Sequence, residues 1–334
     1  MRAFPASHPA ALRSASYGRA PLGLVEDVRA GLSGPGQKML PSRWLYDEVG
    51  SALFEAICLL PEYGLTRADA RILENHAAEI AGRARGPLRV AELGSGSARK
   101  SRPLLAALAR ERPLTYVPID ISRAALTRCE AELGLMARLA VEPLEAEYLE
   151  GLAWAAAARK ESERLLVLFL GSTIGNFDRP EAVEFLAEVR RVLDPGDMFL
   201  LGTDLLKPVP ELLAAYDDAA GVTAAFNLNL LARMNRELDA NFDLTRFVHE
   251  ARWDARERRI EMHLRCVEAQ SVDIPAARLR IEWREGETLW TESSHKFAPD
   301  EPSRLARRAG FRAVEAWSDR EWPFAETLMV AKDA

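Results

Sequence analysis

The sequence of 334 residues has few cysteines and no recognisable metal-binding pattern. Its three cysteines, Cys58, Cys129 and Cys266, lie far apart and are odd in number, and no two of them have the spacing of a metal-ligand pair. The five histidines form no HExxH sequence. These absences argue against a disulfide framework and a metal site, and they favour reduced thiols in a cytoplasmic protein.

Long apolar runs and an excess of basic residues are also missing. No run approaches the roughly 18 apolar residues that a transmembrane helix requires, and residues 1–20 lack the apolar centre of a secretory signal. The net charge is −6 and the pI is near 5.6, whereas proteins that bind nucleic acids or anionic membranes usually carry a basic excess. We therefore expect no nucleic-acid or membrane partner, and a monomer that acts on a small molecule.

Short apolar stretches alternate with amphipathic segments through the middle of the chain. The stretches at 88–93, 114–120, 164–170 and 197–205 are predicted strands. The segments between them, at 100–111, 122–134 and 179–193, are predicted helices, the last with Asp178 as its N-cap. This repeated strand–helix–strand pattern predicts an α/β fold with a doubly wound, Rossmann-like parallel sheet.

Two regions do not follow that alternation. Residues 21–67 are predicted to form helices and loops. Residues 208–250 are predicted to form helices followed by a loop through FDLTRF, and alternating strands come next, the first at 258–272. We expect segments 21–67 and 206–295 to form a second, α+β domain that binds substrate. The main domain is then expected to comprise residues 68–205 and 296–334, with a flexible tail at 1–20.

A glycine-rich turn, VAELGSGSARKS (90–101), follows the first predicted strand of the sheet and opens a predicted helix. A phosphate-binding P-loop and a dinucleotide fingerprint both require a glycine at the position of Arg99, where a side chain would obstruct the ligand. The remaining candidate is the acid-x-G-x-G turn that binds S-adenosylmethionine in class I methyltransferases. Glu92, Gly94 and Gly96 match that turn.

Polar residues also stand at the ends of the next two strands. Asp120 ends the second strand, where a carboxylate can accept hydrogen bonds from both hydroxyls of a ribose. The alternative role for Asp120 is a helix N-cap, which Ser122 offers equally well. Glu147 and Tyr148 lie where a third strand would end. They suit an adenine amino group and an adenine ring, respectively, although the same segment is also compatible with a solvated loop.

The stretch FLGSTIGNF (169–177) ends the fourth predicted strand. Ligands of open α/β sheets bind at the carboxyl ends of the strands, so this stretch is predicted to face the substrate. It is not a nucleophile elbow, because G-x-S-x-G requires a serine where Thr173 stands.

With these features in order, the chain resembles the ergothioneine-pathway L-histidine Nα-methyltransferases. The resemblance runs from residue 24 to the C-terminus and includes LPEYGLTRADARIL, AELGSGSARKSR, FLGSTIGNF, LLGTDLLK and TESSHKF. It implies a class I methyltransferase with a second domain, which uses S-adenosylmethionine to convert histidine to its trimethylated betaine, hercynine. Two alternatives stay open: a related methyltransferase for a different amino acid or amine, and a non-catalytic protein that binds S-adenosylmethionine.

The resemblance also implies a role for individual residues. The cofactor would contact Gly94, Lys100, Asp120, Glu147 and Tyr148. The histidine substrate would be held by Tyr63, Asn176, Tyr216, Met262, Glu292, Ser293 and Ser294. Within that set, Asn176 and Tyr216 would hold the carboxylate, and Glu292 and Ser294 the two imidazole nitrogens. The amino group would lie near Tyr46 and Thr173, the predicted catalytic pair.

The chemistry of Glu292 and Ser294 agrees with a histidine ring. A neutral imidazole has one donor and one acceptor nitrogen, which suit a carboxylate and a hydroxyl, respectively. Met262 is either part of the ring pocket or an ordinary core methionine.

The sequence departs from the family pattern at three places. Glu147-Tyr148 stands where the family usually has Asp-Phe at the adenine, Gly64 replaces a common tyrosine, which is expected to loosen the pocket wall, and His295 replaces a small residue or a cysteine.

Overall fold

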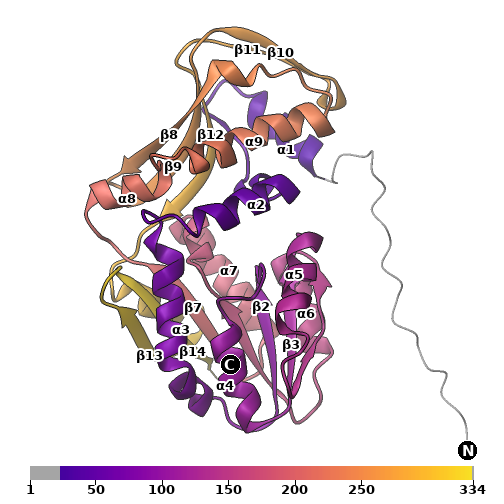
Figure 1. Ribbon diagram of the computed structural model, residues 1–334, viewed down its shortest axis with the longest axis vertical. Coiled ribbons are helices and arrows are strands. Elements are labelled where there is room, and N and C mark those ends of the chain that lie inside the picture. The colour runs from indigo at the N-terminus through magenta and orange to yellow at the C-terminus, as the bar shows by residue number, and fades with distance from the viewer. Residues whose placement is uncertain (1–22, 333–334) are drawn as a thin grey trace, which may run out of the picture.

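The computed structural model describes residues 23–332, which form two main β-sheets flanked by helices (Figure 1). The predicted tail at 1–20 lies outside the described residues. The α-helices are α1 (Leu24–Leu32), α2 (Glu48–Ile57), α3 (Gly64–Arg83), α4 (Arg102–Glu111), α5 (Arg123–Leu133), α6 (Tyr148–Ala157), α7 (Arg179–Val192), α8 (Val209–Tyr216), α9 (Val222–Glu237) and α10 (Glu301–Arg308). Short 3₁₀ helices are η1 (Ser42–Leu45), η2 (Thr173–Asn176), η3 (Leu244–Arg246) and η4 (Pro275–Ala277).

The large sheet has the strand order β13-β14-β7-β6-β2-β3-β4, with the short β5 also paired to β3. Its strands are β2 (Leu88–Leu93), β3 (Leu114–Asp120), β4 (Leu139–Val141), β5 (Leu144–Glu145), β6 (Arg164–Phe169), β7 (Met198–Asp204), β13 (Phe311–Asp319) and β14 (Phe324–Ala331). Strands β7, β6, β2, β3 and β4 run parallel, whereas β14 is antiparallel to both β7 and β13. The chain leaves β2 in one direction and returns to β6 on its other side, so the topological switch point lies between β2 and β6.

The sequence predicted this sheet closely. Strands β2 and β3 have the predicted bounds, β6 and β7 differ from them by one residue at an end, and helices α4, α5 and α7 differ by at most two residues. The Asp178 side chain accepts a hydrogen bond from the Glu181 amide at 2.9 Å and caps α7, as predicted. Every residue of β2 and β7 is buried, as expected for strands covered by helices on both faces. The predicted α/β fold class is confirmed.

The smaller sheet lies beyond the carboxyl ends of the large sheet (Figure 1). Its order is β1-β12-β9-β8, and a separate hairpin pairs β10 with β11. These strands are β1 (Lys38–Met39), β8 (Phe247–Asp254), β9 (Arg259–Cys266), β10 (Gln270–Ile274), β11 (Leu279–Trp283) and β12 (Thr288–His295). Helices α8 and α9 pack on β8 and β9, and α2 packs on α9. We propose that this sheet and its helices form the second domain; the boundaries given above remain a prediction.

Two predictions for this region were wrong. The predicted region of helices and a closing loop extended to residue 250, but β8 begins at Phe247 and pairs along its whole length with β9. The single strand predicted at 258–272 is two strands, because the chain turns after Cys266 and β10 pairs with β11 instead. At the end of the β9–β12 pairing, the backbone amide of Cys266 donates to the Glu287 carbonyl at 2.8 Å.

The expected loosening at Gly64 is not found. A Cβ atom on Gly64 would lie 2.2 Å from the ring of Trp322, so that indole already fills the space a side chain would take. The Trp322 Nε1 donates to the Asp204 carboxylate at 3.0 Å, which fixes the orientation of the ring. The wall next to Tyr63 is therefore completed by a residue from the turn between β13 and β14.

Three further observations concern the described residues only. Cys58, Cys129 and Cys266 are all free thiols. No helix between residues 23 and 332 is both long enough and apolar enough to span a membrane. In the same part of the chain, no group of three or more His, Cys, Asp or Glu side chains has an arrangement suited to a metal ion.

Candidate active site

A single cavity of about 1090 Å³ is lined by residues from both sheets. Pockets for one small molecule usually measure ~300–1,000 Å³, so this cavity has room for a cofactor and a substrate together. Of the predicted site residues, only Lys100 does not line it. The residues that do are Tyr46, Tyr63, Gly94, Asp120, Glu147, Tyr148, Thr173, Asn176, Tyr216, Met262, Glu292, Ser293 and Ser294.

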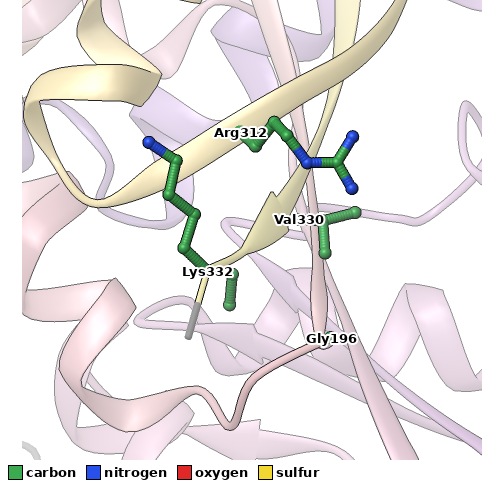
Figure 2. A pocket seen from close by; sticks show the side chains of 5 residues that line it. Gly196, Arg312, Val330 and Lys332 are labelled. Atoms are coloured by element: carbon green, nitrogen blue, oxygen red, sulfur yellow. The ribbon is translucent and has the colours of Figure 1, made fainter. Parts of the chain in front are cut away.

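A second hollow, of about 460 Å³, lies at the opposite end of the large sheet, beside Gly196 in the turn that precedes β7. Figure 2 shows its two cationic side chains, Arg312 and Lys332, pointing away from each other, with Val330 next to Arg312. Among residues 23–332, those that line this hollow carry no carboxylate, hydroxyl or imidazole. Its residues do not form a convergent site, so the large cavity is the candidate active site.

The glycine turn after β2 forms one end of the cavity. Gly94 and Gly96 have φ of 71° and 54°, a backbone region that favours glycine. The Gly94 amide donates to the Ile119 carbonyl at 2.8 Å, which holds the turn against β3. A Cβ atom on Gly96 would meet no atom within 4 Å, and one on Gly94 would lie 3.3 Å from the Tyr148 hydroxyl oxygen. Backbone is thus exposed to the cavity, as a closely bound ligand requires.

Asp120 lies next to this turn, at the end of β3. Its Oδ2 accepts from the Gly96 amide at 3.0 Å and its Oδ1 from the Ser122 amide at 2.8 Å. Ser122, and not Asp120, caps α5, because its hydroxyl oxygen accepts from the Ala125 amide at 3.3 Å. Burial raises the pKa of Asp120, while these backbone hydrogen bonds act in the opposite direction. Each carboxylate oxygen keeps a lone pair for a pair of neighbouring hydroxyls.

Glu147 and Tyr148 begin helix α6 rather than a solvated loop. Glu147 occupies the N-cap position, but its side chain makes no capping hydrogen bond. The Tyr148 ring packs edge-on against Phe169 and Phe185, with centroid distances of 5.5 Å and 6.3 Å. The Glu147 carboxylate therefore does not cap helix α6, and aromatic packing fixes the Tyr148 ring in the wall of the cavity.

Two predicted or suspected cofactor residues lie behind the cavity wall. The Lys100 ammonium is 2.6 Å from Asp69 Oδ2, which also accepts from the Gly171 amide at 2.8 Å. Glu92 is buried and accepts from the Tyr116 hydroxyl at 2.6 Å. Burial raises the pKa of Glu92 to about 7, with Tyr116 opposing the rise. Asp69 and Lys100 thus support the Gly171 turn, and direct contact between Lys100 and the cofactor remains a prediction.

The raised pKa of Glu92 predicts a pH-dependent contribution to stability. The folded protein keeps a proton on Glu92 that the unfolded chain releases above its ordinary pKa of 4.5. This contribution is fully present below pH 4.5 and is lost as pH rises through about 7. We expect the wild type to lose up to about 3 kcal/mol of unfolding free energy relative to Glu92→Gln over that window. Urea unfolding of both proteins across the pH range measures this difference in unfolding free energy. If the unfolding free energies of the two proteins changed with pH in the same way, the prediction would be wrong.

The turn after β6 separates the two ends of the cavity. Gly171 and Ser172 have φ of 71° and 59°, and η2 begins at the next residue. The Ser172 hydroxyl oxygen accepts from the Asp204 amide at 2.9 Å, which fixes the turn to β7. His295 is buried, and its Nδ1 donates to the Gly175 carbonyl at 3.0 Å, which fixes η2 to β12. These two contacts hold Asn176 at the cavity surface.

Thr173 has a defined hydrogen-bonding polarity. Its hydroxyl donates to the Leu170 carbonyl at 3.0 Å, so its only proton is used within the turn. The oxygen that remains available to the cavity is therefore an acceptor. An acceptor at this point suits the N–H group of an amine.

The other end of the cavity is built on β12 and β9. Glu292 and Met262 are cross-strand partners. Burial raises the pKa of Glu292 to about 7, while the Lys296 ammonium and the Tyr46 hydroxyl favour its ionised form. Tyr46 therefore lies close to Glu292. An ionisable carboxyl beside a phenol provides hydrogen-bonding partners for a polar ring.

Aromatic rings enclose this end. The Tyr46 ring packs edge-on against Phe54 and Phe226, each with a centroid distance of 5.4 Å, and Tyr63 packs against Tyr216 at 6.0 Å. Phe54 and Phe226 line the cavity but were not among the predicted site residues. Their positions on the amphipathic helices α2 and α9 marked them only as apolar.

Two substrate-site hydroxyls are joined to a buried ion cluster that sequence reasoning also missed. The Tyr216 hydroxyl donates to Ser294 Oγ at 2.7 Å. The Lys296 ammonium donates to Tyr216 Oη at 2.9 Å and to Ser294 Oγ at 2.8 Å, and it lies 2.8 Å from Asp204 Oδ2. The motifs TESSHKF and LLGTDLLK contain Lys296 and Asp204, and the charge of Asp204 at the end of the apolar strand β7 was the available signal.

Three features define a class I S-adenosylmethionine-dependent methyltransferase. The sheet is parallel with one reversed strand, β14, near its edge; a glycine turn follows β2; and an acidic residue, Asp120, ends β3. Residues 24–331 match the family model described as "Histidine-specific methyltransferase, SAM-dependent". The chain belongs to this family, whose cofactor is S-adenosylmethionine.

Curated relatives carry related names. The chain is 43% identical over 309 residues to "Histidine N-alpha-methyltransferase" of Mycolicibacterium smegmatis, and 40% identical to the protein of that name in Mycobacterium tuberculosis. Each alignment covers 92% of this chain and 94% of the relative. "Ergothioneine biosynthesis protein 1" of Neurospora crassa is 32% identical over 85% of this chain, which spans 32% of that longer protein.

Proposed function

We propose that the protein catalyses the S-adenosylmethionine-dependent Nα-methylation of L-histidine, through three rounds to hercynine, in ergothioneine biosynthesis. One observation carries the proposal: a single cavity joins the Gly94–Asp120 end to the Glu292–Ser294 end. Cofactor and amino acid can therefore meet within one cavity. The names of the curated relatives support the same reaction.

The cavity fits the cofactor in three respects. The glycine turn presents bare backbone, Asp120 offers one lone pair on each of two oxygens for the ribose, and Tyr148 provides a flat wall for adenine. When bound, S-adenosylmethionine supplies a methyl group made electrophilic by its sulfonium centre. The protein contributes position: the reacting atoms must be held in line at van der Waals distance.

The residues of the smaller sheet and the Gly171 turn would hold histidine. The Thr173 oxygen accepts an N–H of the amino group and leaves the nitrogen lone pair directed at the methyl donor. Asn176 and Tyr216 hold the carboxylate, while Glu292 and Ser294 hold the ring. Each methyl added to nitrogen removes one N–H, so the carboxylate and ring contacts must keep the substrate in place through later rounds.

Two proposals about the protein's setting accompany this function. The three free thiols support a reducing, cytoplasmic environment. We also propose that the protein acts as a monomer, because the two sheets of a single chain line both ends of the cavity. Sedimentation equilibrium of the purified protein tests the monomer directly.

Mass spectrometry after incubation with S-adenosylmethionine and all twenty amino acids tests the function. We expect histidine alone to gain one, two and finally three methyl groups. The alternative, a methyltransferase for a different amino acid, predicts gains on that amino acid and none on histidine. A non-catalytic protein predicts cofactor binding by calorimetry with no gain on any amino acid.

A further inference from the structure

Three buried carboxyl oxygens next to the Gly171 turn have no hydrogen-bond donor. Asp69 on α3 and Glu326 on β14 are both 0% exposed. Asp69 Oδ2 lies 2.6 Å from the Lys100 ammonium and accepts from the Gly171 amide at 2.8 Å. Within residues 23–332, however, no N–H or O–H group donates to Asp69 Oδ1 or to either oxygen of Glu326. Buried polar atoms are normally paired, so these three oxygens require an explanation.

A proton between the two carboxyl groups supplies it. Asp69 and Glu326 lie within hydrogen-bonding reach of each other. Two carboxylates repel each other, whereas a carboxylic acid donates its proton to a carboxylate. The acid is Glu326, because Asp69 is already paired with the Lys100 cation. Burial raises the pKa of Glu326 well above its usual range; Asp69 raises it further, and Lys100 opposes the rise.

The strands on either side of Glu326 leave it no other partner. Its cross-strand neighbours are Gly202 of β7 and Trp317 of β13, neither of which carries a charge. A Cβ atom on Gly202 would lie 2.6 Å from Glu326 Oε1, so the glycine leaves the space that the carboxyl group occupies. The charged groups that face Glu326 come from α3, β2 and the loop after β2, and they are Asp69, Glu92 and Lys100.

Asp69 joins the two turns that flank the switch point between β2 and β6. Lys100 follows the glycine turn after β2, and Gly171 follows β6. A Cβ atom on Gly171 would lie 3.1 Å from Lys100 Nζ, so the ammonium lies against the second turn. Gly94 and Gly171 both line the cavity. Because Asp69 Oδ2 contacts both Lys100 and the Gly171 amide, the orientation of one carboxylate fixes the two turns relative to each other.

We propose that Glu326 is a positioning residue for the cofactor: its carboxylic acid donates a hydrogen bond to Asp69 Oδ1 and thereby directs Asp69 Oδ2 to Lys100 and the Gly171 amide. Glu326 does not line the cavity itself. It acts through Asp69 on the turns between which S-adenosylmethionine binds. This role is independent of which amino acid receives the methyl group, because it concerns the cofactor end alone.

Glutamine and methionine at position 326 separate the hydrogen bond from the space that the side chain fills. Glutamine keeps a neutral donor of similar length, whereas methionine keeps the length without a donor. We expect Glu326→Met to raise Kd for S-adenosylhomocysteine by about tenfold or more, because Asp69 Oδ1 loses its partner. Glu326→Gln is expected to keep Kd within about threefold of the wild type. Isothermal calorimetry measures all three affinities; equal values in the two variants, whatever their stabilities, would overturn the positioning role.

Infrared spectroscopy detects the proton on Glu326 directly. A carboxylic acid has a C=O stretching band that a carboxylate lacks, and we expect this band in the spectrum of the wild type minus that of Glu326→Gln at neutral pH. Glu321→Gln is the matched control. Its side chain, in the turn before β14, is 76% exposed and pairs with Arg71, so its difference spectrum should lack the band. Absence of the band for Glu326 would overturn the proposal.

A further substitution guards against a methionine variant that does not fold. Glu326→Asp retains the acid but withdraws it from Asp69 by one methylene, so we expect Kd for S-adenosylhomocysteine to rise by about fivefold or more. Circular dichroism establishes whether each variant is folded. An unchanged Kd in folded Glu326→Asp would remove Glu326 from cofactor positioning. None of these measurements uses an amino-acid substrate, so their outcome is separate from that of the histidine methylation assay.

Discussion

Replacing Glu292 by alanine is expected to lower kcat/KM for histidine by about 100-fold or more, while Kd for S-adenosylhomocysteine changes by less than about twofold. Glu292 is buried in the substrate end of the cavity, where its carboxylate is the acceptor proposed for a ring N–H. Its loss leaves that N–H without a partner, at a cost of about 3 kcal/mol. Steady-state kinetics and calorimetry separate the two effects.

Two controls define what the Glu292 result means. Glu292→Gln keeps an acceptor oxygen but not the charge, so we expect it to retain more histidine turnover than the alanine variant. Glu282→Ala removes an exposed glutamate from β11, outside the cavity, and should behave as the wild type. Undiminished histidine affinity in Glu292→Ala would remove Glu292 from ring recognition.

Replacing Asp120 by asparagine is expected to raise Kd for S-adenosylhomocysteine by about 100-fold. Both carboxylate oxygens already accept a backbone amide, and each has a lone pair left for one ribose hydroxyl. An amide group presents one acceptor and one donor, so it also loses one of the two backbone contacts. Isothermal calorimetry measures the affinity, and circular dichroism establishes whether the variant is folded.

Ser122→Ala is the matched control for Asp120. Ser122 lies two residues after Asp120, lines the same cavity and caps α5, so the loss of its hydroxyl should cost about 1 kcal/mol of stability. Its effect on cofactor affinity should stay below about threefold. Equal losses of affinity in both variants would indicate that Asp120 serves the turn and helix rather than the ribose.

The cofactor end of the site was largely predictable, because its signals are local. A buried strand, a glycine turn and an acid at the end of the next strand follow one another within about thirty residues, and parallel strands bring their carboxyl ends together. The positive φ angles at Gly94 and Gly96 explain why glycine occupies these two positions. The family resemblance added the substrate residues, all of which line the same cavity.

The supporting charges could not be found in this way. Asp69 lies in RADARILENH, a segment that resembles the polar face of any exposed helix, yet its side chain is fully buried against Lys100 and Gly171. Its burial depends on helix α3 packing over the large sheet, which local pattern does not encode. The space beside Gly64 is likewise filled by Trp322, which lies more than two hundred residues further along the chain.

The pairing of β1 with β12 has a consequence for how the chain folds during synthesis. Gln37 donates to the Thr288 carbonyl at 2.7 Å across 251 positions, and Lys38 and Met39 continue the pairing with Leu289 and Trp290. At roughly 5–20 residues per second, the ribosome delivers the partner strand on the order of 10–50 seconds after the first. Contacts of such high sequence separation form late and slowly. The half of the enzyme that selects the amino acid therefore cannot close until after β7 of the α/β sheet has been synthesised, and the last two strands of that sheet, β13 and β14, follow it.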